Sequence, residues 1–284
     1  MFINNLSISK IDDLLKKKWQ VLTMKNVSNI VIEQKNNGIK RIKLNDTNTY
    51  NALSVNMLES LIKIFKDLNK ENKSKVIILE GLGKGFCAGH DLKEINSLKG
   101  KKGYQKLFNL CSDLMINIIN NQKPVIAKVH GAAYAAGCQL VATCDLAISA
   151  EDAVFATPGV NIGLFCSTPM VALSRNVSRK KAMKMLLTGD PINAKYAKEI
   201  GLINDYFENS KLEDEVLKLA ETIASKSNKI VKIGKKAFYK QLEMPLDKAY
   251  KFTSKVMCEN MMTLDAKEGI SAFLEKRNPK WKNK

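Results

Sequence analysis

The chain has little arginine and almost no histidine. Only four of its 46 basic residues are arginine, so 42 are lysine, against 28 acidic residues and a formal charge of +18. Proteins that read base edges rely on the planar arginine fork, and the lysines here are spread along the whole sequence. The charge therefore argues against a nucleic-acid partner. A lysine-rich surface is the plainer interpretation, and attraction for polyanionic ligands is the alternative.

Long apolar runs and metal-ligand patterns are also missing. No stretch of about 18 apolar residues exists, which argues against a membrane span. With only His90 and His130, a histidine metal cluster is excluded, and the six cysteines form no CxxC pair. We therefore expect no metal, and we interpret the cysteines as reduced, packed thiols of an intracellular protein.

The stretch His130–Ser149 has the strongest chemical pattern. It follows a predicted strand, Val125–Val129, and its glycines and alanines leave room for close backbone approach. We predict that a helix begins near Ala136, where the first N–H groups have no partner inside the helix and the helix dipole is positive. Such donors can bind a developing oxyanion. Tight packing alone would explain the same small residues, so a second donor is needed.

The second donor is expected after the predicted strand Val76–Glu80, in a glycine-rich loop. Here four separated motifs, in this order, together resemble the crotonase (enoyl-CoA hydratase/isomerase) superfamily over roughly residues 31–207. The motifs are FCAGHDLKE (Phe86–Glu94), KPVIAKVHGAAYAAGCQLVATCDLAI (Lys123–Ile148), FATPGVNIGL (Phe155–Leu164) and RKKAMKMLLTGDPINAKYAKEIGLIN (Arg179–Asn204).

The resemblance implies an α/β fold, a crotonase-like spiral of ββα repeats with a helical C-terminal trimerisation region. We expect an N-terminal extension over 1–29, either without regular structure or partly helical, a spiral core over 30–207 and a helical region over 208–284. A hairpin at Asn36-Asn37-Gly38 and an N-cap at Ser54 agree with this order. The implied assembly is a homotrimer or a dimer of trimers, in the cytoplasm or, in a eukaryote, the mitochondrial matrix.

The resemblance also implies the site. The backbone N–H groups of Ala88 and Ala136 would form the oxyanion hole for an acyl-CoA thioester. Ala52, Gly89, His90 and Asp91, together with those two alanines, would contact the substrate. Coenzyme A would be part of the substrate, so no separate cofactor is expected. For Asp91 we predict a role in capping or bracing the loop.

Two departures from the family pattern matter more than the matches. The positions of the two hydratase glutamates are occupied by Gln139 and Gly159. Glutamine can orient water but accepts no proton at neutral pH, and glycine has no side chain. Hydration through two glutamates is therefore improbable, since general acid–base catalysis needs titratable groups. Restoring both glutamates is expected to raise it if the geometry is retained. His90 is a candidate proton-transfer group, with a loop hydrogen bond or ligand contact as the plainer alternative.

Three functions remain open. The first is an enzyme that stabilises an enolate of an acyl-CoA or enoyl-CoA. The second is a non-catalytic acyl-CoA binder or regulatory homologue. The third is an enoyl-CoA hydratase or isomerase of fatty-acid metabolism with a different acid or base. A dinucleotide site is disfavoured because Phe86 takes the third glycine position of the fingerprint, and a serine hydrolase lacks its GxSxG elbow.

Overall fold

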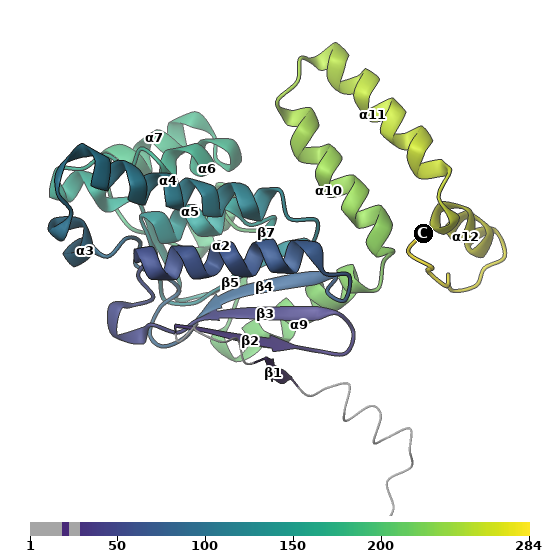
Figure 1. Cartoon of the computed structure of the whole chain (residues 1–284), viewed down its shortest axis with the longest axis horizontal. Coiled ribbons are helices and arrows are strands. Elements are labelled where there is room, and N and C mark those ends of the chain that lie inside the picture. The colour runs from purple at the N-terminus through teal and green to yellow at the C-terminus, as the bar shows by residue number, and fades with distance from the viewer. Residues whose placement is uncertain (1–18, 23–28) are drawn as a thin grey trace, which may run out of the picture.

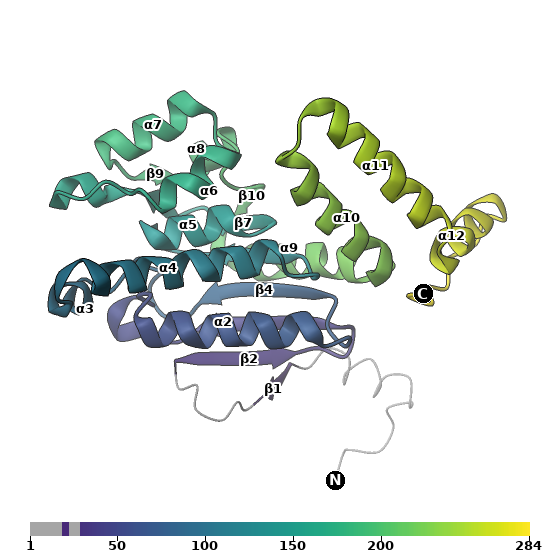
Figure 2. The same cartoon turned by 45° about the horizontal axis from the view of Figure 1, so that its top comes forward.

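The computed structural model describes residues 19–22 and 29–284. The remaining N-terminal residues, on which most of the predicted extension falls, lie outside the described part. Within that part, no helix combines the length and the apolarity that a bilayer crossing requires. Figures 1 and 2 show a sheet covered by helices on both faces, with the last three helices extending away from it.

A seven-stranded sheet organises the core. Its first strands form the predicted hairpin, with Gly38 at φ 87° in the turn. From the third strand onward all neighbours are parallel. The sheet begins before residue 30, because Gln20–Leu22 pairs antiparallel with Ile32–Gln34. In spatial order the strands are β1 (Gln20–Leu22), β2 (Ile30–Gln34), β3 (Ile39–Leu44), β4 (Val76–Gly81), β5 (Val125–Val129), β7 (Leu146–Ala150) and β10 (Asp205–Phe207).

A smaller sheet collects the strands that follow β5 and β7. It contains β6 (Ala132–Tyr134), β8 (Val154–Ala156) and β9 (Ile192–Asn193). The loop after β4 joins it through a parallel bridge between Cys87 and Ala133. Three successive units of the chain thus place one strand, or one bridge, in each sheet, which is the repeat expected of the spiral.

Helices cover both faces of the large sheet because its strands alternate their side chains. Ile77 and Leu79 of β4 belong to a core shared with α2 (Val55–Lys70) and α4 (Gly100–Ile119). Val76 and Ile78 face the opposite way, into a core shared with α9 (Asn209–Ala224). The predicted cap of α2 is confirmed, since the Ser54 side chain accepts the N–H of Met57.

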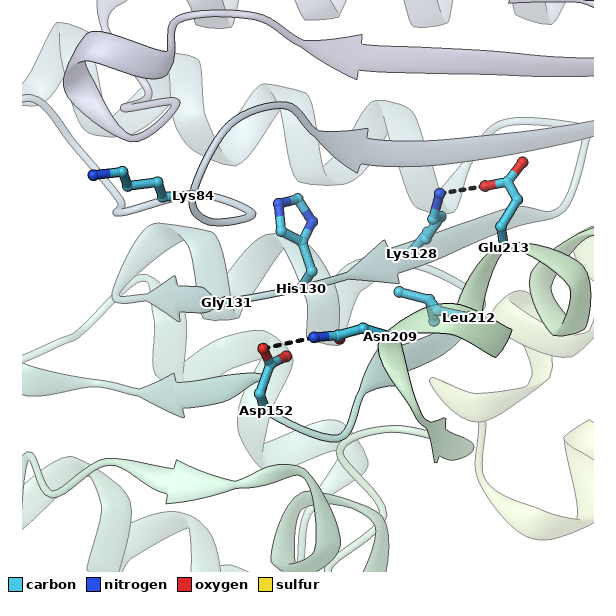
Figure 3. Close-up of a pocket in the computed structure, with 8 residues that line it drawn as sticks. All are labelled: Lys84, Lys128, His130, Gly131, Asp152, Asn209, Leu212 and Glu213. Atoms are coloured by element: carbon cyan, nitrogen blue, oxygen red, sulfur yellow. Dashed lines mark hydrogen bonds and ion pairs between the residues drawn. The ribbon is translucent and has the colours of Figure 1, made fainter.

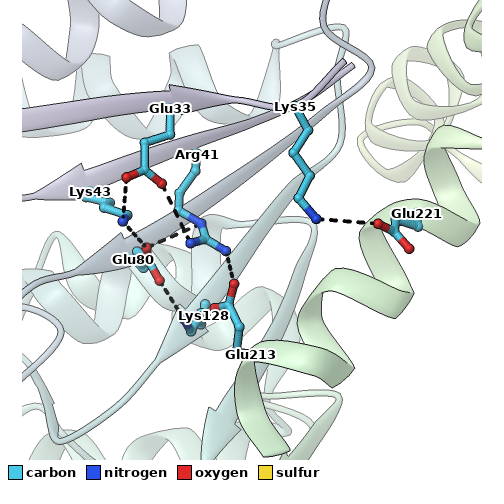
Figure 4. A network of polar contacts seen from close by, with 8 residues as sticks. All are labelled: Glu33, Lys35, Arg41, Lys43, Glu80, Lys128, Glu213 and Glu221. Atoms are coloured by element: carbon cyan, nitrogen blue, oxygen red, sulfur yellow. Dashed lines mark hydrogen bonds and ion pairs between the residues drawn. The ribbon is translucent and has the colours of Figure 1, made fainter. Parts of the chain in front are cut away.

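Beneath α9 the sheet carries a cluster of charges, the outer-face ion cluster (Figure 4). Glu80 lies 2.9 Å from Lys128, 3.4 Å from Arg41 and 3.8 Å from Lys43. Glu33 pairs with Lys43 at 2.9 Å, and Glu213 of α9 contacts both Arg41 and Lys128. The Trp19 ring lies 4.0 Å from the Arg41 guanidinium carbon. Within this cluster of three cations and three carboxylates, the contacts of Glu213 with Arg41 and Lys128 hold α9 against the sheet.

The other helices build the site and the C-terminal region. The chain end folds back on that region: the Trp281 indole donates to the Ser225 carbonyl at 2.8 Å, and buried Asp265 accepts the N–H groups of Lys282 and Asn283. These helices are α3 (Leu92–Ser97), α5 (Ala136–Thr143), α6 (Pro169–Asn176), α7 (Arg179–Thr188), α8 (Ala194–Glu199), α10 (Asn228–Leu242), α11 (Leu246–Met261) and α12 (Leu264–Leu274).

Candidate functional site

Three segments that are distant in sequence meet beyond the C-terminal ends of β4 and β5. The Cys87 N–H donates to the Ala132 carbonyl at 3.1 Å, and the Tyr134 N–H donates to the Cys87 carbonyl at 2.9 Å. On the other side of the loop, the Leu53 N–H donates to the Gly89 carbonyl at 2.7 Å. The loop that contains Ala88 and Gly89 is therefore held between the start of α2 and the β6–α5 turn.

Glycines make this close approach possible. A Cβ at Gly137 would stand 2.1 Å from the Cys87 carbonyl oxygen, so no side chain fits there. Gly89 has φ 93°, and a Cβ on it would stand 3.1 Å from the Ala136 nitrogen. The backbone of one loop thus lies against the first turn of α5, as the glycine pattern suggested.

Ala136 is the first residue of α5, so its N–H has no acceptor within the helix. The preceding residue, Ala135, turns the chain with φ 48° and ψ −114°, a conformation that alanine rarely adopts. Every residue of α5 is buried. The predicted start of this helix is confirmed, and its first backbone nitrogen lies close to Gly89.

Ala88 is exposed, but its N–H is already engaged. It donates to the Tyr50 carbonyl at 3.0 Å. Tyr50 and Asn51 both have left-handed backbones, with φ 53° and 57°. The buried Asn51 side chain fixes this turn by donating to the carbonyls of Leu82 (2.8 Å), Gly85 (3.0 Å) and Phe86 (3.2 Å). An acyl oxygen at Ala88 would therefore share this N–H with Tyr50 or replace it.

His90 has one ring nitrogen in contact with a carbonyl and one that is buried without a hydrogen-bond partner. Nδ1 lies 3.2 Å from the Leu53 carbonyl oxygen, and the ring meets Phe108 of α4 edge-on at 5.5 Å between centroids. Nε2 is buried and has no hydrogen-bond partner. Burial lowers the pKa of the imidazole, while the contact with Leu53 raises it in part. Because a carbonyl only accepts, the proton lies on Nδ1 and Nε2 presents a lone pair.

The two positions at which the sequence resemblance places the hydratase glutamates differ in what they allow. Gln139 is buried on α5, and its Oε1 accepts the Cys111 thiol at 3.9 Å. Gly159 lies in the 3-10 turn η2 (Pro158–Ile162), where a Cβ would stand 2.5 Å from the Leu164 carbonyl oxygen and 2.9 Å from the Cys166 sulfur. An acid at position 159 is therefore excluded by the backbone, a feature that no local sequence signal announced.

The thiols around this region are not nucleophiles. Burial raises the pKa of Cys87, Cys111 and Cys138 to about 12, and it also raises that of Cys166. A thiol with a raised pKa supplies little thiolate at neutral pH. All six cysteines are free. Within residues 19–22 and 29–284, no group of His, Cys, Asp or Glu side chains is arranged to hold a metal ion.

Asp91 has the capping role that we predicted. Its Oδ1 accepts the N–H groups of Lys93 at 2.8 Å and Glu94 at 3.3 Å, at the start of α3. The Glu94 carboxylate in turn accepts the Val55 N–H at 2.9 Å and links the starts of α3 and α2. Ala52 is buried, and its N–H donates to the Thr49 hydroxyl at 3.2 Å.

Two cavities lie away from these residues. One, of about 310 Å³, is lined by Lys84, Lys128, His130 and Asp152 among others (Figure 3); there His130 Nε2 lies 2.9 Å from the Gly83 carbonyl oxygen. The other, of about 1240 Å³, lies between α4–α6 and α10 and includes Lys232 in its wall. Neither is lined by Ala88, His90 or Ala136.

Comparison with known proteins identifies the fold and the family. The family model described as enoyl-CoA hydratase/isomerase matches residues 34–284. The mitochondrial enoyl-CoA hydratase domain-containing protein 3 of Danio rerio is 44% identical over 276 residues, which cover 95% of this chain and 96% of that protein.

Solved structures agree. The crystal structure of the human enoyl coenzyme A hydratase domain-containing protein 3 has a TM-score of 0.86 and 45% identity, covering 89% of this chain and 100% of that one. An enoyl-CoA hydratase structure from Mycobacterium smegmatis has a TM-score of 0.89 and 45% identity, covering 90% and 99%. The crotonase-type architecture predicted from the motifs is confirmed, and the chain belongs to the enoyl-CoA hydratase/isomerase family.

Proposed function

We propose that this protein binds an acyl-CoA or enoyl-CoA thioester and stabilises negative charge on its carbonyl oxygen with the N–H groups of Ala88 and Ala136. The observation that carries the proposal is the Ala136 N–H, which has no helical acceptor and lies against the Gly89 loop. Preorganised N–H groups of this kind stabilise an enolate more than the ground-state carbonyl. Ala88 is exposed, so a ligand can reach it and compete with the Tyr50 carbonyl for its N–H.

The range of reactions that this site supports after binding is narrower than the family name implies. Two-glutamate hydration lacks both acids, because Gln139 is an amide with its Oε1 on a thiol and Gly159 has no room for a side chain. His90 is the proposed proton-transfer group, since it has an unoccupied lone pair two residues from Ala88. Ala52, Gly89 and Asp91 would shape the approach of the coenzyme A portion, with Asp91 acting through its cap of α3.

One observation favours a second candidate, a non-catalytic acyl-CoA binder. The thiols near the site have raised pKa values, and the lowered pKa of His90 weakens it as a base. The third candidate, an enoyl-CoA hydratase or isomerase of fatty-acid metabolism, has support in the names of the relatives and would need His90 as its acid or base.

Replacing Ala136 by proline tests the proposal. Proline is tolerated at the first position of a helix, where it removes the N–H and also restricts the backbone of the preceding residue, Ala135. We expect the variant to lose about 10²–10³-fold of the rate at which the α-carbon of an acyl-CoA exchanges with D2O, measured by mass spectrometry. Arg179→Pro, at the first position of α7, is the matched control and should leave the rate unchanged.

Three outcomes separate the candidates. Calorimetry that shows no wild-type binding of any acyl-CoA in a panel of chain lengths overturns the proposal. Binding without exchange supports the non-catalytic binder. Rapid hydration of a short 2-enoyl-CoA by the wild type supports the third candidate and contradicts the role given to the missing glutamates.

For assembly we propose a homotrimer or a dimer of trimers formed through α10–α12. These helices expose large apolar side chains, including Phe273 at 82% and Leu274 at 73%, and apolar patches of this kind mark interfaces. Sedimentation that shows a monomer would contradict it. The names of the relatives favour a mitochondrial location over the cytoplasm, and fractionation of the source cells tests that.

A further inference from the structure

The loop after β4 is held along two edges, and one of them depends largely on a single side chain. On the first edge, the N–H and the carbonyl of Cys87 are both bonded to β6, at 3.1 and 2.9 Å. On the second edge, the Ala88 N–H donates to the Tyr50 carbonyl at 3.0 Å, and the Asn51 side chain donates to the Phe86 carbonyl at 3.2 Å. The loop is therefore an extended segment held between β6 and the turn before α2.

Asn51 uses both polar atoms of its side chain on backbone groups. Its Nδ2 donates to the carbonyls of Leu82 at 2.8 Å, Gly85 at 3.0 Å and Phe86 at 3.2 Å. Its Oδ1 accepts the Asp46 N–H at 2.9 Å. The residue is fully buried, at 0% exposure, so it has no surface for a ligand. Its φ of 57° lies in the left-handed region, which asparagine tolerates better than most residues.

What Asn51 restrains is the approach of two backbones at the site. A Cβ on Gly89 would stand 3.1 Å from the Ala136 nitrogen, and one on Gly137 would stand 2.1 Å from the Cys87 carbonyl oxygen. With backbones this close, a small tilt of the loop changes where its N–H groups lie relative to the first turn of α5. Hydrogen bonds to β6 alone would leave the loop free to tilt about that edge. The Asn51 contacts on the opposite edge oppose such a tilt.

We infer that Asn51 is a positioning residue of the acyl-CoA site: its side chain keeps the loop of Ala88 and Gly89 at the distance from α5 at which both backbones meet a thioester oxygen. The inference rests on the proposed acyl-CoA binding at Ala88 and Ala136. Asn51 acts through the carbonyls that it holds and does not contact the ligand. Its loss should loosen the loop and leave the fold in place, because the edge bonded to β6 remains.

Calorimetry on Asn51→Asp tests this. Aspartate has the same shape and can still accept the Asp46 N–H, but an ionised carboxylate cannot donate to the three carbonyls. We expect butyryl-CoA to bind about tenfold more weakly, the order of one displaced hydrogen bond. Exchange of the α-carbon with D2O, followed by mass spectrometry, should slow by about 100-fold, because misplaced groups affect the transition state more than the ground state.

A second buried asparagine provides the matched control. Asn121 is 1% exposed, and its side chain also donates to a carbonyl, that of Phe65 at 3.0 Å, and accepts an N–H, that of Lys123 at 3.0 Å. It follows the C-terminal end of α4, and Phe65 lies in the second half of α2, away from the helix start that borders the site. Asn121→Asp should lose stability in urea and keep the wild-type affinity and exchange rate.

The ratio of wild-type to variant affinity at each pH gives a second readout. Burial among carbonyls raises the pKa of an introduced carboxyl above its ordinary value, and the protonated acid can donate again. The partners of this side chain are backbone groups, so no ion pair opposes protonation. For Asn51→Asp the ratio should fall toward one as the pH is lowered from about 8 to about 5. Asn51→Gly accommodates φ 57° but has nothing to titrate, so its ratio should stay near ten throughout.

The two proposals fail differently. Wild-type affinity in both Asn51 variants, or an equal loss of affinity in Asn121→Asp, overturns the inference and leaves acyl-CoA binding intact. Failure of both Asn51 variants to fold, judged by circular dichroism, shows that the side chain supports the whole fold and overturns the inference as well. Binding of no acyl-CoA by the wild type overturns the proposed function, and the inference with it.

Discussion

Two buried polar regions of this molecule are built in opposite ways. In the outer-face ion cluster, every carboxylate has a cation within 4 Å: Glu80 contacts three, and Glu33 and Glu213 contact two each. Among the described residues of the candidate site no ion pair is present. Its polar groups are backbone N–H donors, an amide, thiols, the Asp91 carboxylate that caps α3 and the neutral ring of His90, whose Nε2 has no partner.

The difference distinguishes polar groups that stabilise the fold from polar groups that remain able to bind a ligand. In the ion cluster each charge has an opposite charge within 4 Å, although Glu33 Oε2 and Arg41 Nε make no hydrogen bond, and the value of the cluster lies in fixing α9 on the sheet. A site with an unpaired acceptor and an unpaired helix N–H is less stable by itself but has interactions left for a ligand. One further feature agrees: the backbones of Tyr50, Asn51 and Ala135 have positive φ, and all three residues border the site.

The largest effect is expected from breaking the ion cluster. Glu80→Ala removes the carboxylate shared by Arg41, Lys43 and Lys128, and it should lower the free energy of unfolding by about 3–5 kcal/mol, because three largely buried cations are then left with two carboxylates. Urea denaturation measures it. Glu215→Ala, which removes an exposed pair with Lys218, is the control and should change stability by less than about 1 kcal/mol. Acyl-CoA affinity should be unchanged in both, and a loss of affinity in Glu80→Ala would mean that the two regions are coupled.

The next effect comes from the closed position 159. Gly159→Ala places a Cβ 2.5 Å from the Leu164 carbonyl oxygen and should destabilise the fold by about 1–3 kcal/mol through overpacking. Gly234→Ala, in α10 with no atom within 4 Å of the added Cβ, should be neutral or stabilising by up to about 1 kcal/mol. A stable Gly159→Ala would show that the turn yields easily.

This result revises the expectation that restoring both glutamates would raise hydration. The condition for it was that the geometry is retained, and at position 159 the backbone does not allow it. The double variant Gln139→Glu, Gly159→Glu should therefore either unfold or hold the carboxylate at position 159 in the wrong place. Hydration of a short 2-enoyl-CoA, followed in the purified variant, would contradict this.

What the sequence predicted well was local. The turn at Gly38, the caps at Ser54 and Asp91 and the start of α5 each depend on a few neighbouring residues, and each is present in the structure. The rest of the architecture was predicted from the family motifs, because few folds are compatible with four such motifs in this order.

What the sequence could not predict was the pairing of distant groups. The hydrogen bond from the Ala88 N–H to the Tyr50 carbonyl joins residues 38 positions apart. Nothing in the sequence of either segment indicates that the two are partners. The contact of His90 with Leu53 and the closure of Gly159 by Leu164 depend in the same way on how loops settle. The ion cluster draws its residues from β2, β3, β4, β5 and α9, so in the sequence its lysines and glutamates are indistinguishable from ordinary surface residues (Figure 4).

The smallest predicted effect bears most directly on the contrast between the two regions. Ala135 has φ 48° and ψ −114°, close to the first central residue of a type II′ turn, where glycine is preferred. Ala135→Gly should relieve this strain and raise the free energy of unfolding by about 1 kcal/mol. The matched control Ala132→Gly, in β6 with ordinary backbone, should lower it by about 0.5–1 kcal/mol.

The strained backbone of Ala135 should also matter for ligand binding, and this predicts a second effect of Ala135→Gly. Because Ala135 aims the Ala136 N–H, a freer backbone at 135 should weaken acyl-CoA binding even as the fold becomes more stable. Calorimetry and urea denaturation on the same preparation measure both quantities. Gains in stability and in affinity together would show that the unusual backbone of Ala135 contributes nothing to the ligand, and that the site differs from the ion cluster in its charges alone.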